Sequence, residues 1–206
     1  LDRVESLAAV YLQAIRRMQP RGPYALCGFS FGGLVAFELA RLLYRQGESA
    51  APLVLLEPYM HQDLRAAERA RQRLLRVAGK LRRQNARQLA QWAGSHLARL
   101  GRSMALLAGL VAPQSPAESL GLAGAQARVY DALLSAVATY RPQPYAGGRV
   151  ILVRAQVPLD GYLDPLPVWE RVAAAGLQVV SVPDGHLDFV AGQARRVADI
   201  VDAALD

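Results

Sequence analysis

The sequence predicts an α/β fold, with a mostly parallel sheet flanked by helices and a large helical insertion. Three observations indicate it: short apolar runs of strand length, amphipathic helical runs that alternate with them, and an Arg-rich helical stretch in mid-chain. Strands that alternate with helices are typical of parallel sheets. A chain of 206 residues suits one domain better than two. We therefore expect a single domain, 1–206, with its core in 1–60 and 141–206 and a helical lid over about 61–140.

The first part of the chain alternates between helical and strand patterns. Apolar residues at helical spacing, and then short apolar runs, predict helix, strand, helix and strand over 1–18, 24–27, 31–46 and 52–56. Pro20 ends the first helix, and Gly47 ends the second.

The second part begins with the insertion and then returns to alternation. A long helical pattern is followed by a Pro/Ser/Gly-rich break and a further helix, over 64–108, 112–124 and 126–140. Strand, helix, strand and helix follow over 149–153, 166–175, 178–182 and 188–204.

Composition excludes several classes of protein. The apolar content of 52% and charged content of 20% are those of an ordinary globular chain. Its single cysteine, Cys27, excludes an internal disulfide framework and a cysteine-rich metal site, so we expect a reducing, cytoplasmic setting. No apolar run reaches the ~18 residues of a membrane span. The first residues show no basic-then-apolar pattern that would predict a signal peptide, and because the sequence starts at Leu1 without Met we expect a piece of a longer protein.

Positive charge is concentrated in one segment of the insertion. The net charge is +7, and arginines, Arg82 and Arg83 among them, crowd residues 65–87. A basic stripe can bind nucleic acid, but no aromatic platform or DNA-binding pattern is interleaved with it, so we expect no nucleic-acid partner. A solvated helix face, or docking of an acidic partner or a phosphate-bearing ligand, accounts for the charge.

The stretch Gly28-Phe29-Ser30-Phe31-Gly32 fits G-x-S-x-G and lies where that motif requires, between an apolar strand and a helix. Such a turn forces the serine into a strained backbone, and small residues two positions away on each side allow the chain to approach itself closely. The helix that begins at Phe31 points its N-terminal N–H groups at the serine. Ser30 is therefore a candidate nucleophile and the Phe31 N–H a candidate oxyanion donor.

A serine hydroxyl needs a base, and the chain has three histidines. His96 lies in the basic insertion, and His61 follows the second predicted strand. His186 follows the last predicted strand and precedes the last helix, which matches the order nucleophile, acid, base along such folds. We therefore predict His186 as the general base.

The acid of the triad must follow a strand and hold the imidazole of the base. Glu57 ends the strand after the nucleophile helix, whereas Asp160 and Asp164 follow the next strand. Glu57 is the preferred acid, and both aspartates stay open as alternatives.

These residues resemble the type I thioesterase domains that terminate nonribosomal peptide and polyketide synthetases, in the α/β-hydrolase family. The similarity lies in GPYALCGFSFGGLVAFELARLL (22–43), in DGHLDFV (184–190) and in Trp169. The resemblance implies that Ser30 is acylated and His186 is the base. Glu57 stands where most of the family has Asp, and related editing thioesterases take their acid from the later loop near Asp164.

Two further expectations concern the turn and the start of the chain. Cys27 is expected to be a buried strand residue beneath the turn. The resemblance implies an N-terminal part, of about 60 residues by the size of typical domains, that carries the second oxyanion N–H. We expect that part to be absent from the present sequence.

The resemblance implies release of an acyl or peptidyl chain from the phosphopantetheine thioester of a carrier protein, by hydrolysis or by cyclisation, with no bound cofactor or metal. The insertion would cover the acyl chain, and its basic stripe would meet an acidic carrier. An editing thioesterase or carboxylesterase is an alternative with the same triad. A catalytically inactive hydrolase fold used for binding is an alternative of another class.

Overall fold

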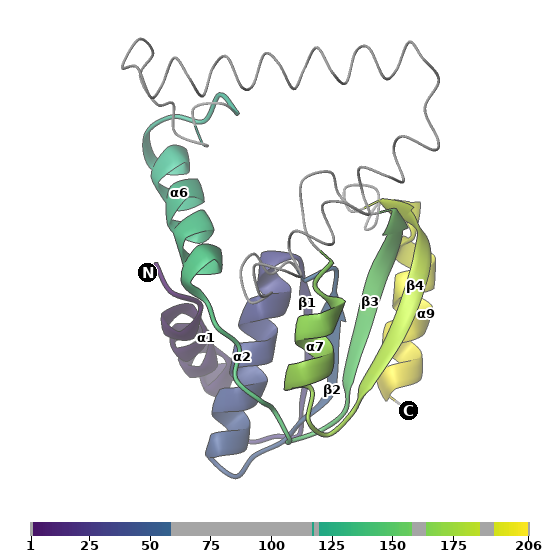
Figure 1. The fold of residues 1–206 in the computed structure, drawn as a ribbon. Helices are drawn as coiled ribbons and strands as arrows, with labels where there is room; N and C mark the ends of the chain where they lie inside the picture. The colour runs from purple at the N-terminus through teal and green to yellow at the C-terminus, as the bar shows by residue number, and fades with distance from the viewer. Residues whose placement is uncertain (1, 59–116, 118–119, 158–163, 186–191, 206) are drawn as a thin grey trace, which may run out of the picture. The chain divides into compact units, whose positions relative to one another are not determined.

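The computed structural model describes residues 2–58, 117, 120–157, 164–185 and 192–205 (Figure 1). The chain divides into two compact units, one made of Leu1–Leu64 and Ala132–Asp206 and the other of Arg65–Asp131. The predicted lid helices over 64–108 lie outside the described residues.

The first unit contains a four-stranded parallel sheet in the order β1-β2-β3-β4 (Figure 1). Its strands are β1 (Tyr24–Phe29), β2 (Ala50–Leu56), β3 (Val150–Val157) and β4 (Leu177–Gly185). Because all four strands run in the same direction, their carboxyl ends meet at one edge of the sheet.

Helices cover both faces of this sheet (Figure 1), as its apolar strands require. The described helices that lie wholly in the first unit are α1 (Val4–Met18), α2 (Phe31–Arg45), α7 (Leu166–Val172) and α9 (Ala194–Leu205). Successive strand residues point to opposite faces. Leu53 and Leu55 of β2 accordingly pack in the cluster that contains α1, α2 and α7, whereas Val54 and Leu56 pack in the cluster that contains α9.

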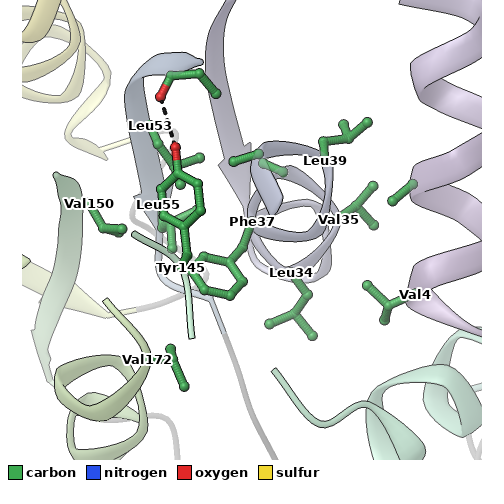
Figure 2. Close-up of a cluster of buried hydrophobic side chains, with 14 of the residues drawn as sticks. Val4, Leu34, Val35, Phe37, Leu39, Leu53, Leu55, Tyr145, Val150 and Val172 are labelled. Carbon is green, nitrogen blue, oxygen red and sulfur yellow. Dashed lines mark hydrogen bonds between the residues drawn. The ribbon is translucent and has the colours of Figure 1, made fainter. Parts of the chain in front are cut away.

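Aromatic residues fill the larger of these two clusters. The rings of Phe37 and Tyr145 meet edge to face with centroids 5.9 Å apart, and those of Phe37 and Trp169 with centroids 5.0 Å apart. Figure 2 shows Tyr145 directed at β2, where its hydroxyl donates to the Ala50 carbonyl at 3.3 Å. Trp169, expected as a feature of the resemblance, is completely buried.

Two charged residues of α2, Glu38 and Arg41, are buried beside this core. Glu38 on α2 is 2% exposed and accepts hydrogen bonds from Arg41 Nη1 at 2.6 Å and from the Tyr140 hydroxyl at 2.9 Å. A buried carboxylate requires such partners, because an unpaired charge in the core is costly.

The predicted α/β order is confirmed, with differences at element ends. Helix α6 (Gly124–Thr139) crosses the boundary between the two units. Helix α7 ends at Val172 rather than Ala175, because Ala173 forms a β-bridge with Tyr145 and Gly176 adopts a φ of +117°. Gly47 has a φ of +78° and ends α2 as expected.

In the described part of the chain, no helix is long and apolar enough to cross a bilayer.

Candidate active site

Ser30 is the single residue between β1 and α2, and its backbone is in an unusual conformation. Its φ is 53° and its ψ is −119°, a region that non-glycine residues rarely adopt and that costs about 1–3 kcal/mol. The Ser30 N–H donates to the Leu56 carbonyl at 2.8 Å, and the Gly33 N–H donates to the Ser30 carbonyl at 3.0 Å. The turn is therefore fixed both to the neighbouring strand and to the helix that follows it.

The glycines around Ser30 have different roles. A Cβ on Gly28 would lie 2.2 Å from the carbonyl oxygen of Gly32, so only glycine fits at position 28. A Cβ on Gly32 would meet nothing within 4 Å, whereas a Cβ on Gly33 would lie 2.9 Å from the Pro58 Cβ. Before the serine, Gly28 must be small, as predicted. After the serine, it is Gly33 and not Gly32 that has no room for a Cβ.

Phe31 begins α2, directly after Ser30. As the first residue of a helix, its N–H has no partner one turn back within the helix. The positive end of the α2 dipole therefore faces the Ser30 turn.

Glu57 lies directly after β2, next to the Ser30 turn, because Phe29 of β1 pairs with Leu56 of β2. Its φ of 46° is also in the left-handed region. The Glu57 N–H donates to the Val153 carbonyl at 2.8 Å, and its carboxylate accepts the Ala155 N–H. The side chain of this partly buried residue is thus held against the end of β3.

Asp164 has partners among the described residues of β3 and α7. Arg154 Nη2 donates to its Oδ2 at 3.2 Å, and the Leu166 N–H, in the first turn of α7, donates to its Oδ1 at 3.0 Å. This carboxylate therefore caps the first turn of α7 and pairs with an arginine of β3. Asp160 lies outside the described residues.

Strand β4 ends at Gly185, whose partner in β3 is Val157. His186 is the next residue in the chain, and it lies outside the part that the structure describes, as do His61 and His96. Of the predicted site residues, the structure thus brings Ser30, Phe31 and Glu57 together at the carboxyl edge of the sheet, with the end of β4 at the same edge (Figure 1).

The expectation that Cys27 is buried is wrong, because this residue is exposed. β1 is an edge strand of the described sheet. Leu26 points into the cluster that contains α1 and α2, so Cys27 points to the opposite face. The α9 cluster on that face includes residues of β2, β3 and β4 but, from β1, only Phe29.

Sequence reasoning missed the partners of the two carboxylates. Arg154 is the one charged residue in the mostly apolar run VILVRAQV, and a charge at such a position indicates a nearby acid. The Ala155 N–H carries no signal in the sequence, because every non-proline residue has one. Among the described residues, no cluster of His, Cys, Asp or Glu could hold a metal ion.

A parallel sheet with a strained serine between its first strand and the next helix, and a carboxylate after the second strand, defines the α/β-hydrolase class. Comparison with known proteins agrees. The model of the Thioesterase domain family matches residues 1–205, and the chain belongs to this family.

Curated relatives include synthases that are much longer than this chain. The chain is 49% identical over 55 residues to N-(5-amino-5-carboxypentanoyl)-L-cysteinyl-D-valine synthase of Amycolatopsis lactamdurans, which is 27% of this chain and 2% of the synthase. It is 48% identical over 52 residues to a non-reducing polyketide synthase of Cladonia metacorallifera, which is 25% of this chain and 2% of that protein. The chain thus spans only a small part of the curated relatives it matches.

Solved structures share the fold. The NocB thioesterase domain, in covalent complex with a fluorophosphonate nocardicin G analog, superposes with a TM-score of 0.58 at 24% identity, covering 100% of this chain and 76% of that one. The RedJ thioesterase from the prodiginine pathway of Streptomyces coelicolor gives a TM-score of 0.58 at 18% identity, covering 98% and 71%. The type II thioesterase BorB gives 0.58 at 17%, covering 99% and 71%.

Proposed function

We propose that the chain is a serine thioesterase that releases an acyl or peptidyl chain from the phosphopantetheine thioester of a carrier protein, with Ser30, His186 and Glu57 as its triad. The observation that carries the proposal is the backbone of Ser30, which has a left-handed φ of 53° at the junction of β1 and α2. Strain of this kind at a polar residue is typical of a functional site. It presents the hydroxyl at the edge of the sheet where a substrate can reach it.

The reaction follows from this arrangement. His186 takes the proton of the Ser30 hydroxyl as the oxygen attacks the thioester carbonyl carbon. The oxyanion that forms accepts the Phe31 N–H, and the positive end of α2 stabilises it. The C–S bond then breaks, the phosphopantetheine thiolate takes the proton back from the imidazolium, and the acyl group stays on Ser30.

The second half repeats these steps with another nucleophile. His186 deprotonates a water molecule or a nucleophile of the bound chain, which attacks the acyl-Ser30 ester. Collapse of the second oxyanion returns the proton to Ser30 and releases an acid or a ring. Water entry decides between hydrolysis and cyclisation, and we propose that the segment over about 61–140 controls it as a lid.

Glu57 is the acid we propose, and its contacts support it. It lies beside the Ser30 turn, and the Ala155 N–H fixes its carboxylate. Asp164, the alternative, already pairs with Arg154 and caps α7.

The carrier-bound substrate is proposed from the relatives. They include a peptide synthase, polyketide synthases and the NocB thioesterase domain, and also type II thioesterases. A type II thioesterase would use the same triad to clear misloaded carriers. The two functions differ in substrate. They are distinguished by comparing kcat/KM for the complete acyl or peptidyl product on its carrier with kcat/KM for a short acyl group on the same carrier.

A fluorophosphonate probe tests the chemistry directly, since the NocB domain carries a covalent fluorophosphonate analog. We expect the full chain to gain one adduct by mass spectrometry, located on Ser30 by peptide mapping, and Ser30→Ala to gain none. Ser49 is exposed and lies at the opposite end of the strands, so it gives the control: Ser49→Ala should be labelled like the wild type. Absence of an adduct on Ser30 would favour a binding module with an inactive hydrolase fold.

A further inference from the structure

We infer that Gly33 is a positioning residue for Glu57: its missing side chain lets Pro58 pack against α2, and this contact sets the backbone from which the Glu57 carboxylate projects. The inference rests on the proposed function, because it assigns Gly33 a part in holding the triad acid.

The contact is tight and lies between the two halves of the site. Gly33 is a buried residue in the first turn of α2, and Pro58 is a buried residue directly after Glu57. A Cβ built on Gly33 would lie 2.9 Å from the Pro58 Cβ, 3.5 Å from the Pro58 Cα and 3.1 Å from the carbonyl oxygen of Gly28. Real Cβ atoms essentially never approach another heavy atom within 3.0 Å, so one of these groups must move.

A displacement of Pro58 is transmitted to Glu57 because little between them can bend. The proline ring fixes the φ of residue 58 and restricts the backbone of residue 57. Glu57 already has a left-handed φ of 46°, and its N–H and carboxylate are both held by β3, through Val153 and Ala155. Because the sheet itself takes no part in the clash, a shift of Pro58 would pull the Glu57 backbone away from these two β3 partners and so displace its carboxylate relative to Ser30.

Gly32 provides a matched comparison. It is the adjacent residue of the same helix, and a Cβ on it would meet nothing within 4 Å. Alanine favours helix over glycine at either position, and Gly32→Ala leaves the Gly32 carbonyl where it contacts Gly28. The two substitutions thus differ only in what the added methyl group meets.

The experiment measures kcat and KM of the full chain for a small acyl thioester. We expect Gly33→Ala to lower kcat about 100-fold, as a misplaced catalytic group does, with KM within a few-fold, and Gly32→Ala to stay within two-fold of the wild type. Pro58→Gly removes the clashing Cβ, so it should recover at least ten-fold when combined with Gly33→Ala. Pro58→Ala keeps that atom and should recover much less.

Two outcomes would overturn the inference: equal kcat for Gly33→Ala and Gly32→Ala, or equal recovery by Pro58→Gly and Pro58→Ala. If Gly33→Ala does not fold, circular dichroism of Gly33→Ala combined with Pro58→Gly or with Pro58→Ala shows which second substitution restores folding. Folding restored by Pro58→Gly but not by Pro58→Ala supports the contact, and folding restored by neither overturns it. Failure of the proposed function is separate, since the wild type would then not turn over the thioester, or Ser30→Ala would turn it over as fast as the wild type does.

Discussion

Ser30 and Glu57 are the two non-glycine residues with a left-handed backbone in the part of the chain that the structure describes. They directly follow Phe29 and Leu56, which pair with each other across β1 and β2. Each such residue costs about 1–3 kcal/mol and persists only where its surroundings hold it. Both strained residues lie at adjacent strand ends. Such clustering is expected at a functional site, where side chains are held in fixed positions.

Exchange of each carboxylate for its amide tests the choice of acid. Glu57→Gln keeps the size and most hydrogen bonds of the side chain but loses the charge that stabilises the imidazolium, so kcat should fall about 10⁴-fold. Asp164→Asn should cost less than ten-fold in kcat, since it weakens a pair with Arg154 and a helix cap. Steady-state kinetics on an acyl thioester measure both, and a larger loss for Asp164→Asn would transfer the role to Asp164.

At the residue scale, the sequence predicts what depends on local order along the chain. Ser30, Phe31 and Glu57 stand where a motif and a strand end put them, and the structure places them there. The packing of Pro58 on Gly33 and the exposure of Cys27 depend on neighbours distant in sequence. The pattern G-x-S-x-G-G gives Gly32 and Gly33 the same letter, and only the structure separates their surroundings.

At the scale of elements, α2 is joined to the end of α6 by a buried polar contact. The Tyr140 hydroxyl, one residue after α6, donates to Glu38 on α2, and Arg41 neutralises the same carboxylate. Burial, and then the Glu38 carboxylate, raise the pKa of Tyr140. The helix that follows Ser30 is therefore tied to the segment where the chain returns from the insertion.

Tyr140→Phe should lower the free energy of unfolding by about 1–3 kcal/mol near pH 8, because it removes a hydrogen bond to a buried charge. The wild type keeps the Tyr140 proton in the native state, while the unfolded chain loses it above pH ~10. The contribution of this hydroxyl is therefore complete below pH ~10 and is lost as the pH rises further, by about 1.4 kcal/mol per pH unit.

Urea denaturation of both proteins from pH 8 to 11 measures this difference, which should shrink above pH ~10. Tyr11→Phe, on the exposed side of α1, is the control and should change stability by less than about 0.5 kcal/mol. A constant difference between wild type and Tyr140→Phe across this range would show that Tyr140 ionises alike in both states.

At the scale of elements, the sequence predicted where the strands lie better than where strands and helices end. Apolar runs placed all four strands, because buried parallel strands must be apolar on both faces. Strands β3 and β4 extend to Val157 and Gly185, beyond the predicted ends at 153 and 182, because these two residues still pair with each other across a break in the apolar pattern. The end of α7 was missed because it depends on a bridge to Tyr145, 28 residues away.

At the scale of the whole molecule, the chain consists of the sheet-containing unit and a second unit over Arg65–Asp131. The second unit coincides with most of the predicted lid and contains the Arg-rich segment of the sequence, including Arg82 and Arg83. These two arginines lie outside the described residues, so the proposal that they meet an acidic carrier protein rests on charge alone. Electrostatic attraction of this kind raises association rates more than it changes chemistry.

Charge reversal at Arg82 and Arg83 tests this proposal at the same scale. Arg82→Glu/Arg83→Glu should lower kcat/KM for a carrier-bound thioester about ten-fold or more at low salt, because a repelled partner associates more slowly. The difference should diminish as salt screens it, and turnover of a small acyl thioester should be unchanged. Arg195→Glu/Arg196→Glu makes the same change in charge on the exposed side of α9 and should leave both activities close to the wild type. Docking at this segment would be contradicted if the Arg82/Arg83 variant lost turnover of the carrier-bound and of the small thioester equally. It would also be contradicted if the Arg195/Arg196 variant lost as much carrier turnover as the Arg82/Arg83 variant.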